Sequence, residues 1–297
     1  MKSGFVTIIG KPNVGKSTLL NRIIGEKIAI TSKRPQTTRT KIIGIFNTDD
    51  CQIVFFDTPG IHEPKNKLDN AMKKDIREAR NDGDIVIHLV DKLVGDAPHL
   101  EAPNSPFGQK LPLSVGRPLG DILVLNKVDT FPKEKILPFI EENKDKYTDI
   151  FCVSAKTGEG VPHLLGYLKA KMPEGERFFP DDEITTQPER VLMAEYIREQ
   201  AFRLLGDEIP FGTAVIIDKM KVNDKNILEV DAVIYCEKER HKGIIIGKNG
   251  SKLKEISTKA RLQGERFFGK KIFLQVRVKP AENWRDNDVM IKNFLGQ

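Results

Sequence analysis

Short apolar runs separated by helical stretches fill the first part of the chain. Five runs have the length and β-branched content of buried strands: 5–9, 52–56, 84–90, 122–125 and 150–153. Helical patterns follow over 18–24 and 161–172. Continuous apolar strands that alternate with helices are typical of a mainly parallel sheet covered on both faces. We therefore predict an α/β domain over residues 1–172, with a mainly parallel sheet flanked by helices.

The pattern changes after residue 172. Residues 173–184 have the Pro, Gly and charge content of a linker, and a second series of elements begins at 185. The apolar positions predict a helix over 187–205 with Gly206 as its C-cap, strands over 213–220 and 227–236, and a strand over 271–278. A helix beginning at Ser251 precedes the last strand. Residues 185–297 are therefore predicted to form a separate α+β domain.

Residues 10–17 read GKPNVGKS and fit the phosphate-binding pattern G-x-x-x-x-G-K-[ST]. A predicted strand precedes this motif and a predicted helix follows it, which is the context that the motif needs. Backbone N–H groups between Gly10 and Gly15 and the helix N-terminus can face phosphates. Lys16 can then reach the β- and γ-phosphates, and the Ser17 hydroxyl can bind Mg²⁺.

Three further motifs each follow a predicted strand. Asp57 and Gly60, in the sequence DTPG, can hold the metal through water and meet a γ-phosphate. In the sequence NKVD, the Asp129 carboxylate can accept hydrogen bonds from N1–H and the 2-amino group of guanine, which adenine lacks. The sequence SAK at 154–156 closes over the base. Together these motifs predict a guanine-nucleotide site.

In these motifs, and in the segment QTTR at 36–39, the chain resembles the Era family of TrmE–Era–EngA-like P-loop GTPases. The resemblance implies Mg²⁺ held by Ser17, Thr38 and Asp57, with Thr37 as the alternative to Thr38. It implies catalytic roles for Lys16, Thr38 and Gly60. It also raises K⁺ as a second cation with Asn13 as ligand, although asparagine in such a loop is otherwise ordinary turn chemistry. The implied GTP-binding residues are Gly10, Asn13, Val14, Gly15, Lys16, Ser17, Thr18, Asp57, Gly60, Asn126, Lys127, Asp129, Ser154, Ala155 and Lys156.

Ile61 follows the DTPG motif, where Ras-like enzymes carry a glutamine that orients the attacking water. An isoleucine cannot hydrogen-bond water. Either backbone and metal position the water, or hydrolysis awaits a partner. The resemblance implies slow intrinsic turnover.

The second domain contains the tetrapeptide GKNG at 247–250, between an Ile-rich stretch and an amphipathic helix. The order helix–strand–strand–helix–helix–strand and this GxxG loop resemble a type II KH domain, which clamps the backbone of about four nucleotides. The predicted RNA-binding residues are Gly247, Lys248, Asn249, Gly250 and Lys252.

The positive charge of the chain is concentrated in one segment. The net charge is +6, and residues 237–279 hold 13 Lys or Arg against four Glu, a local +9 that leaves −3 elsewhere. A basic segment of this kind is typical of a nucleic-acid interface.

Composition also limits the class of protein. Three scattered cysteines predict reduced thiols, and no apolar run approaches the ~18 residues of a membrane span. The chain starts almost directly on the first strand, which leaves no room for a signal peptide, so we expect a cytoplasmic protein.

Five prolines between Asp91 and Gly120 interrupt the place where the family has a loop, a helix and a loop. The sequence therefore does not support the expected crossover helix over 92–120.

The resemblance spans nearly the whole chain and implies a function. It predicts a monomeric GTPase that binds the 3′ end of small-subunit (16S) rRNA, assists assembly of the small ribosomal subunit and contacts the membrane surface peripherally. One alternative is an RNA-binding KH protein with an impaired nucleotide domain. The other is a GTPase that acts on a protein or tRNA, with the KH-like domain as a scaffold.

Overall fold

The computed structural model describes residues 1–32, 34–93 and 121–295, which form two compact units. The first unit comprises Met1–Ile28, Thr38–Pro64 and Ala71–Thr186. The second comprises Gln187–Gln297 together with two short early segments, Ala29–Thr37 and Lys65–Asn70. The prediction that no crossover helix forms over 92–120 falls almost entirely on 94–120, which lie outside the described residues.

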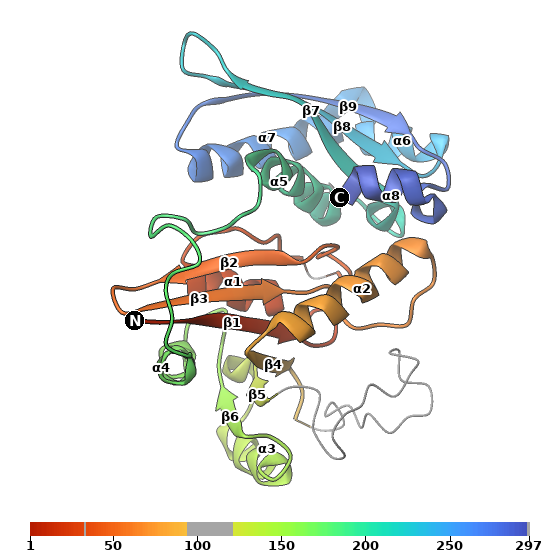
Figure 1. Cartoon of the computed structure of the whole chain (residues 1–297). Helices are drawn as coiled ribbons and strands as arrows, with labels where there is room; N and C mark the ends of the chain where they lie inside the picture. Colours follow the sequence, from red (N-terminus) through yellow and green to blue (C-terminus); the bar gives the residue numbers. More distant parts are fainter. Residues whose placement is uncertain (33, 94–120, 296–297) are drawn as a thin grey trace. The chain divides into compact units, whose positions relative to one another are not determined.

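A six-stranded sheet in the order β2-β3-β1-β4-β5-β6 forms the centre of the first unit. Only β2 is antiparallel to its neighbour; the other pairs are parallel. Figure 1 shows α2 in front of this sheet and α1 behind it. The elements of the unit are β1 Lys2–Ile9, α1 Lys16–Ile24, β2 Ile42–Asn47, β3 Cys51–Asp57, α2 Lys67–Asp82, β4 Ile85–Val90, β5 Ile122–Leu125, α3 Ile136–Asn143, β6 Asp149–Cys152 and α4 Val161–Lys171. The first turn of α2 belongs to the second unit.

The parallel strands are mostly apolar because both faces of the sheet are covered. Every residue of β3 is buried, and so are all four residues of β5. Since β1, β3, β5 and β6 run in the same direction, their carboxyl ends lie at one edge of the sheet. The four sequence motifs follow these four strand ends, so the fold gathers them at that edge, where open α/β sheets bind ligands.

The segment after α4 belongs to the first unit and packs along its sheet. The Phe178 ring lies 4.5 Å from that of Phe5, and Gln52 Oε1 accepts hydrogen bonds from the N–H groups of Phe178 and Phe179 at 2.7 and 3.0 Å. Ile45 N donates to Ile184 O at 2.9 Å. Residues 178–184 are therefore held to the sheet by backbone and side-chain hydrogen bonds.

The second unit is a three-stranded sheet in the order β7-β8-β9, with β7 antiparallel and β9 parallel to β8. Helices α5 and α7 pack on one face, as Figure 1 shows. The bounds are α5 Glu189–Leu204, β7 Thr213–Val222, β8 Leu228–Cys236, α6 Glu239–Ile246, α7 Ser251–Phe268, β9 Ile272–Pro280 and α8 Asp288–Leu295. The predicted α+β order is therefore confirmed, with α8 as an addition at the end.

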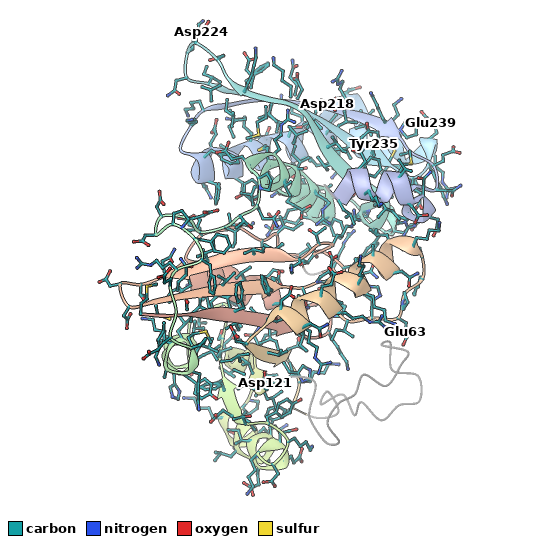
Figure 2. All side chains as sticks on the ribbon, in the orientation of Figure 1. Glu63, Asp121, Asp218, Asp224, Tyr235 and Glu239 are labelled. Carbon is teal, nitrogen blue, oxygen red and sulfur yellow. The ribbon has the colours of Figure 1, made fainter. Side chains whose placement is uncertain are left out.

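The core of the second unit joins α5 and α7 to the inward face of the sheet. Alternate residues of β8, from Leu228 to Cys236, are buried there, as the period-2 pattern predicts. Asp224 lies at the tip of the β7–β8 hairpin and Tyr235 lies near the other end of β8 (Figure 2). The C-cap prediction for α5 was wrong: the helix ends one residue earlier, with Leu205 as its cap in an extended conformation, so Gly206 is not the cap.

Candidate functional site

The phosphate loop ends at the start of α1 in the way that the motif requires. Gly15 has a left-handed backbone, with φ at 104°, and a Cβ there would lie 2.2 Å from Asn126 Nδ2. Only glycine fits this position. Lys16 is buried, and its Nζ donates to the carbonyl oxygens of Gly10 at 3.1 Å and Lys11 at 3.0 Å. Burial lowers the pKa of Lys16 to about 8, a shift that the Asp57 carboxylate opposes.

Three of the predicted metal ligands lie together beside Lys16. Ser17 Oγ donates to Asp57 Oδ2 at 2.6 Å and lies 3.0 Å from Thr38 Oγ1. Asp57 is fully buried, and burial raises its pKa to about 6 against the opposing effects of Lys16 and the two hydroxyl groups. Among the described residues, its second oxygen, Oδ1, has no hydrogen-bond partner.

These three residues fit a hard cation. One buried carboxylate oxygen lacks a donor within the described part of the chain, and two hydroxyl oxygens converge on the same carboxylate. Oxygen ligands of this kind suit Mg²⁺, which is usually bound through one or two carboxylates together with substrate phosphates. The Thr37 hydroxyl instead donates to Arg34 O at 2.9 Å.

Gly60, at the end of the DTPG motif, and the following Ile61 have different surroundings. Gly60 is buried so close to Pro12 that a Cβ would lie 2.8 Å from the Pro12 backbone. Ile61 N donates to Gly10 O at 3.1 Å. The Ile61 side chain packs against Ile9 and other members of an apolar cluster, so it is part of the core of the first unit.

The two base-recognition motifs are tied to each other and to the phosphate loop. Asn126 is buried; its Nδ2 donates to Val14 O at 2.7 Å, and its Oδ1 accepts from Ala155 N at 2.9 Å. Ser154 Oγ donates to Asp129 Oδ1 at 2.7 Å, while the Asp129 side chain remains exposed. The carboxylate is therefore oriented on one side by Ser154 and open to a ligand on the other.

Two residues outside the motifs support this arrangement. Arg22 of α1 donates from Nε to Ala155 O at 3.1 Å and from Nη2 to Lys156 O. Lys127 Nζ donates to Asn13 O at 2.8 Å and pairs with Asp91. Sequence reasoning missed Arg22 and Asp91, because no motif marks them. Thr18 follows Ser17 in the first turn of α1, half-buried.

The GxxG loop of the second unit is an open turn between α6 and α7. Gly247 has φ at 74° and ψ at 174°, and a Cβ there would lie 2.6 Å from that of Lys252. Lys248 and Asn249 lie on the surface, and Asn249 and Gly250 both have left-handed backbones. The 18-residue helix α7 begins at once with Ser251, so its N-terminus faces the loop. Accessible backbone, a lysine and a helix N-terminus together suit a phosphate chain.

Comparisons with known proteins agree with this geometry. Residues 5–127 match a family model described as a 50S ribosome-binding GTPase, and residues 208–285 match a KH domain. The chain is 47% identical to GTPase Era of Clostridioides difficile, with 99% of this chain and 98% of that protein aligned. The chain belongs to the Era family of GTPases. The GTPase Era of Syntrophus aciditrophicus is 45% identical over 99% of this chain and 94% of its own.

Two solved Era structures are similar to 99% of this chain, with TM-scores of 0.90 and 37% identity. One is a single-residue variant of Aquifex aeolicus Era bound to GDP·AlF4⁻, matched over 99% of both chains. The other is Era in complex with MgGDPNP and nucleotides 1506–1542 of 16S ribosomal RNA, matched over 99% of this chain and 98% of that one. As a member of the Era family, the chain is a GTPase with a P-loop domain followed by a KH domain.

A membrane span would need a long apolar helix. Within residues 1–32, 34–93 and 121–295, no helix reaches that length and hydropathy.

Proposed function

We propose that this chain is a GTP-hydrolysing factor that binds the 3′ end region of 16S rRNA and assists assembly of the small ribosomal subunit. The RNA assignment rests on the accessible GxxG loop of the second unit, in a chain that matches over its length an Era structure holding that RNA. The nucleotide assignment rests on the four motifs that meet at one edge of the first sheet.

On this proposal, Lys16 holds the β- and γ-phosphates together with loop amides from Gly10 to Thr18. Ser17, Asp57 and Thr38 hold Mg²⁺, which when bound neutralises negative charge on the phosphate oxygens. Thr38 is preferred to Thr37 because its hydroxyl lies 3.0 Å from that of Ser17, whereas the Thr37 hydroxyl is engaged by Arg34 O. The remaining donors and acceptors are Gly60 toward the γ-phosphate and Asn126, Lys127, Asp129, Ser154, Ala155 and Lys156 around the guanine.

The attacking water has no side chain to orient it at position 61. Ile61 packs into an apolar cluster and contributes no hydrogen bond from its side chain. Catalysis is therefore assigned to Lys16, Thr38 and the Gly60 amide, with slow intrinsic turnover. A partner that supplies the missing polar group would raise the rate.

The RNA strand is assigned to the loop Gly247–Gly250 and to Lys252 of α7. The glycines let phosphates approach the backbone, and Lys248 lies at the surface. Lys252 is half-buried, with Nζ 4.0 Å from Glu255 Oε2. Replacing Lys252 by alanine should weaken RNA binding modestly and lower the salt slope by about 0.7 for a single strand.

A loop variant tests the RNA proposal. Lys248→Asp with Asn249→Asp puts two carboxylates where phosphates should lie, so affinity for an RNA of the 16S 3′ end should fall sharply while GTP affinity stays unchanged. The matched control is Lys270→Asp with Lys271→Asn, which changes the charge by the same amount at exposed positions. Those positions lie beyond the far end of α7, about 27 Å from the loop for an 18-residue helix.

Both variants are titrated against single-stranded and duplex RNA of equal length. A loss confined to the loop variant, with preference for the single strand, supports a KH interface. Equal losses in both variants and no strand preference would show a general polyanion surface instead. Sequencing RNA crosslinked to the purified protein then separates 16S rRNA from a tRNA, and absence of RNA favours a protein partner.

The other finer assignments are proposals of the same kind. We divide the chain into a GTPase domain at 1–172, a connecting segment at 173–184 and a KH domain at 185–297. K⁺ binding through Asn13, a monomeric state, and a cytoplasmic location with peripheral contact to the membrane remain predictions. Asn13 is exposed, and its carbonyl oxygen accepts from Lys127 Nζ. The alternative of an impaired nucleotide domain depends on residues 92–120, of which 94–120 lie outside the described residues, so it stays an alternative.

A further inference from the structure

An early segment of the chain is held at both ends by one helix of the second unit. The segment runs from Thr31 to Thr37. Thr31 hydrogen-bonds to Glu199 of α5, and Thr37 hydrogen-bonds to Arg198, the residue before Glu199 in that helix. The second unit includes Ala29–Thr37, and Ile30 is part of its apolar core. The residue that follows in the chain is Thr38, the proposed metal ligand.

The first attachment is a buried carboxylate. Glu199 has no exposed surface; its Oε1 accepts from Thr31 N at 3.1 Å and from Arg203 Nη2 at 2.7 Å. Arg203 Nη2 also donates to Thr31 O at 3.2 Å. Both polar groups of the Thr31 backbone are therefore fixed to α5.

The second attachment is a buried guanidinium. Arg198 is 3% exposed, and its Nε and Nη2 donate to the two carboxylate oxygens of Glu195 at 2.7 and 2.6 Å. The same Nη2 donates to Thr37 O, and the guanidinium carbon lies 5.3 Å from the centre of the Phe202 ring. Nη1 is buried and has no hydrogen-bond partner among the described residues.

Arg198 forms its ion pair with Glu195 inside α5 and does not need Thr37 for it. Its hydrogen bond to Thr37 O, in contrast, fixes the peptide unit that leads into Thr38. We propose that Arg198 is a positioning residue for Thr38, and so for the GTP-bound state; this inference rests on the proposed role of Thr38. Arg198 touches neither nucleotide nor metal in this scheme and acts only through the Thr37–Thr38 peptide.

The first test compares affinities for a non-hydrolysable GTP analogue and for GDP. Arg198→Met keeps an unbranched apolar stem but removes the guanidinium and its donors, and Arg198→Lys keeps the charge with a single donor group. The matched control is Arg190→Met, an exposed arginine on the same helix whose Nη2 makes a long contact of 3.4 Å to Asp218 O. A charge-assisted hydrogen bond of ordinary strength predicts about a tenfold loss in analogue affinity for Arg198→Met.

Arg198→Met should also raise the Mg²⁺ concentration needed for half-saturation with the analogue. GDP affinity should stay within about twofold, because GDP lacks the γ-phosphate whose contacts with Mg²⁺ hold such a loop in place. Arg198→Lys should recover part of the loss. A merely structural role would lower the affinities for both nucleotides together, along with thermal stability, and that outcome overturns the proposal.

The second test removes the residue through which Arg198 is meant to act. In a Thr38→Ala background, Arg198→Met should change the analogue affinity less than about twofold. A full tenfold loss there would show that Arg198 acts by another route and overturn the positioning role. If Thr38→Ala alone leaves Mg²⁺ dependence unchanged, the proposed metal role of Thr38 fails and the inference fails with it. If Thr38→Ala has its effect but Arg198→Met has none, only the inference fails.

Discussion

The ionised Asp57 side chain should destabilise the nucleotide-free protein, although the same carboxylate is proposed to bind Mg²⁺. The variant Asp57→Asn tests this by its free energy of unfolding with and without Mg²⁺ and GTP. Burial raises the pKa of Asp57 in the folded protein to about 6, against an ordinary value of 3.8. The difference of about 2 pH units corresponds to roughly 3 kcal/mol by which ionisation disfavours folding. Because the folded pKa is the higher one, this penalty is fully present above about pH 6 and fades as the pH falls toward 3.8.

The asparagine variant should therefore be more stable than wild type at pH 7.5 in the absence of metal and nucleotide. In the variant, Lys16 loses its favourable interaction with the Asp57 charge, and the new amide needs its own hydrogen-bond partners. We therefore expect the free energy of unfolding to rise by about 1–3 kcal/mol. The gain should shrink steadily between pH 6 and pH 4. With Mg²⁺ and GTP present the order should reverse, because only wild type has the carboxylate for the metal.

The assay must report on the unfolding of the first unit, which contains Asp57. The single tryptophan, Trp284, lies in the second unit, so its fluorescence would report on that unit instead. Urea dependence of hydrogen exchange at β1 and β3 amides, in EDTA, reports the sheet around Asp57. Asp145→Asn, at an exposed aspartate, removes the same charge and should change little. Equal or lower stability of Asp57→Asn at pH 7.5, or a gain that persists unchanged at pH 4, would refute the reasoning.

Three more outcomes follow from the site. Asp129→Asn should shift preference from GTP toward xanthosine triphosphate, whose 2-oxo group needs a donor; equal binding of ATP and GTP by wild type in competition would contradict this assignment of the carboxylate. Lys16→Ala should abolish tight triphosphate binding, whereas Ile61→Ala should leave binding intact and cost stability, because Ile61 packs in the core; similar losses of affinity in both variants would show that the roles are misassigned. Arg22→Met should raise the dissociation constants of GTP and GDP alike by about tenfold through loosening of the loop at Ala155 and Lys156, since it removes charged hydrogen bonds to both carbonyls; a change in hydrolysis rate with unchanged affinity would not fit that role.

Local pattern was sufficient for most of the fold. Apolar runs mark the parallel strands because both of their faces are buried, and β8 shows its buried face by simple alternation. The antiparallel edge strand β2 and helices α2, α3 and α8 were not among the predicted elements. Gly44 lies inside β2 and breaks its apolar pattern, and a Cβ there would lie 2.7 Å from a Leu20 methyl carbon. A glycine that is needed for close contact with a helix has low strand propensity, so the sequence pattern did not predict this strand.

The sequence alone was enough to predict the chemistry of the nucleotide site, because the phosphate loop and the three other motifs place each needed group within a few residues of a strand end. It did not determine which of two adjacent threonines has its hydroxyl beside Ser17, since both lie in a polar loop with no periodicity. Tertiary structure decided that, through the bond from Thr37 Oγ1 to Arg34 O and the approach of Thr38 to Ser17. It also decided the supports at Arg22, Asp91 and Arg198, whose side chains meet partners 36 to 161 residues away. Such contacts depend on how distant elements pack, so no local spacing could reveal them.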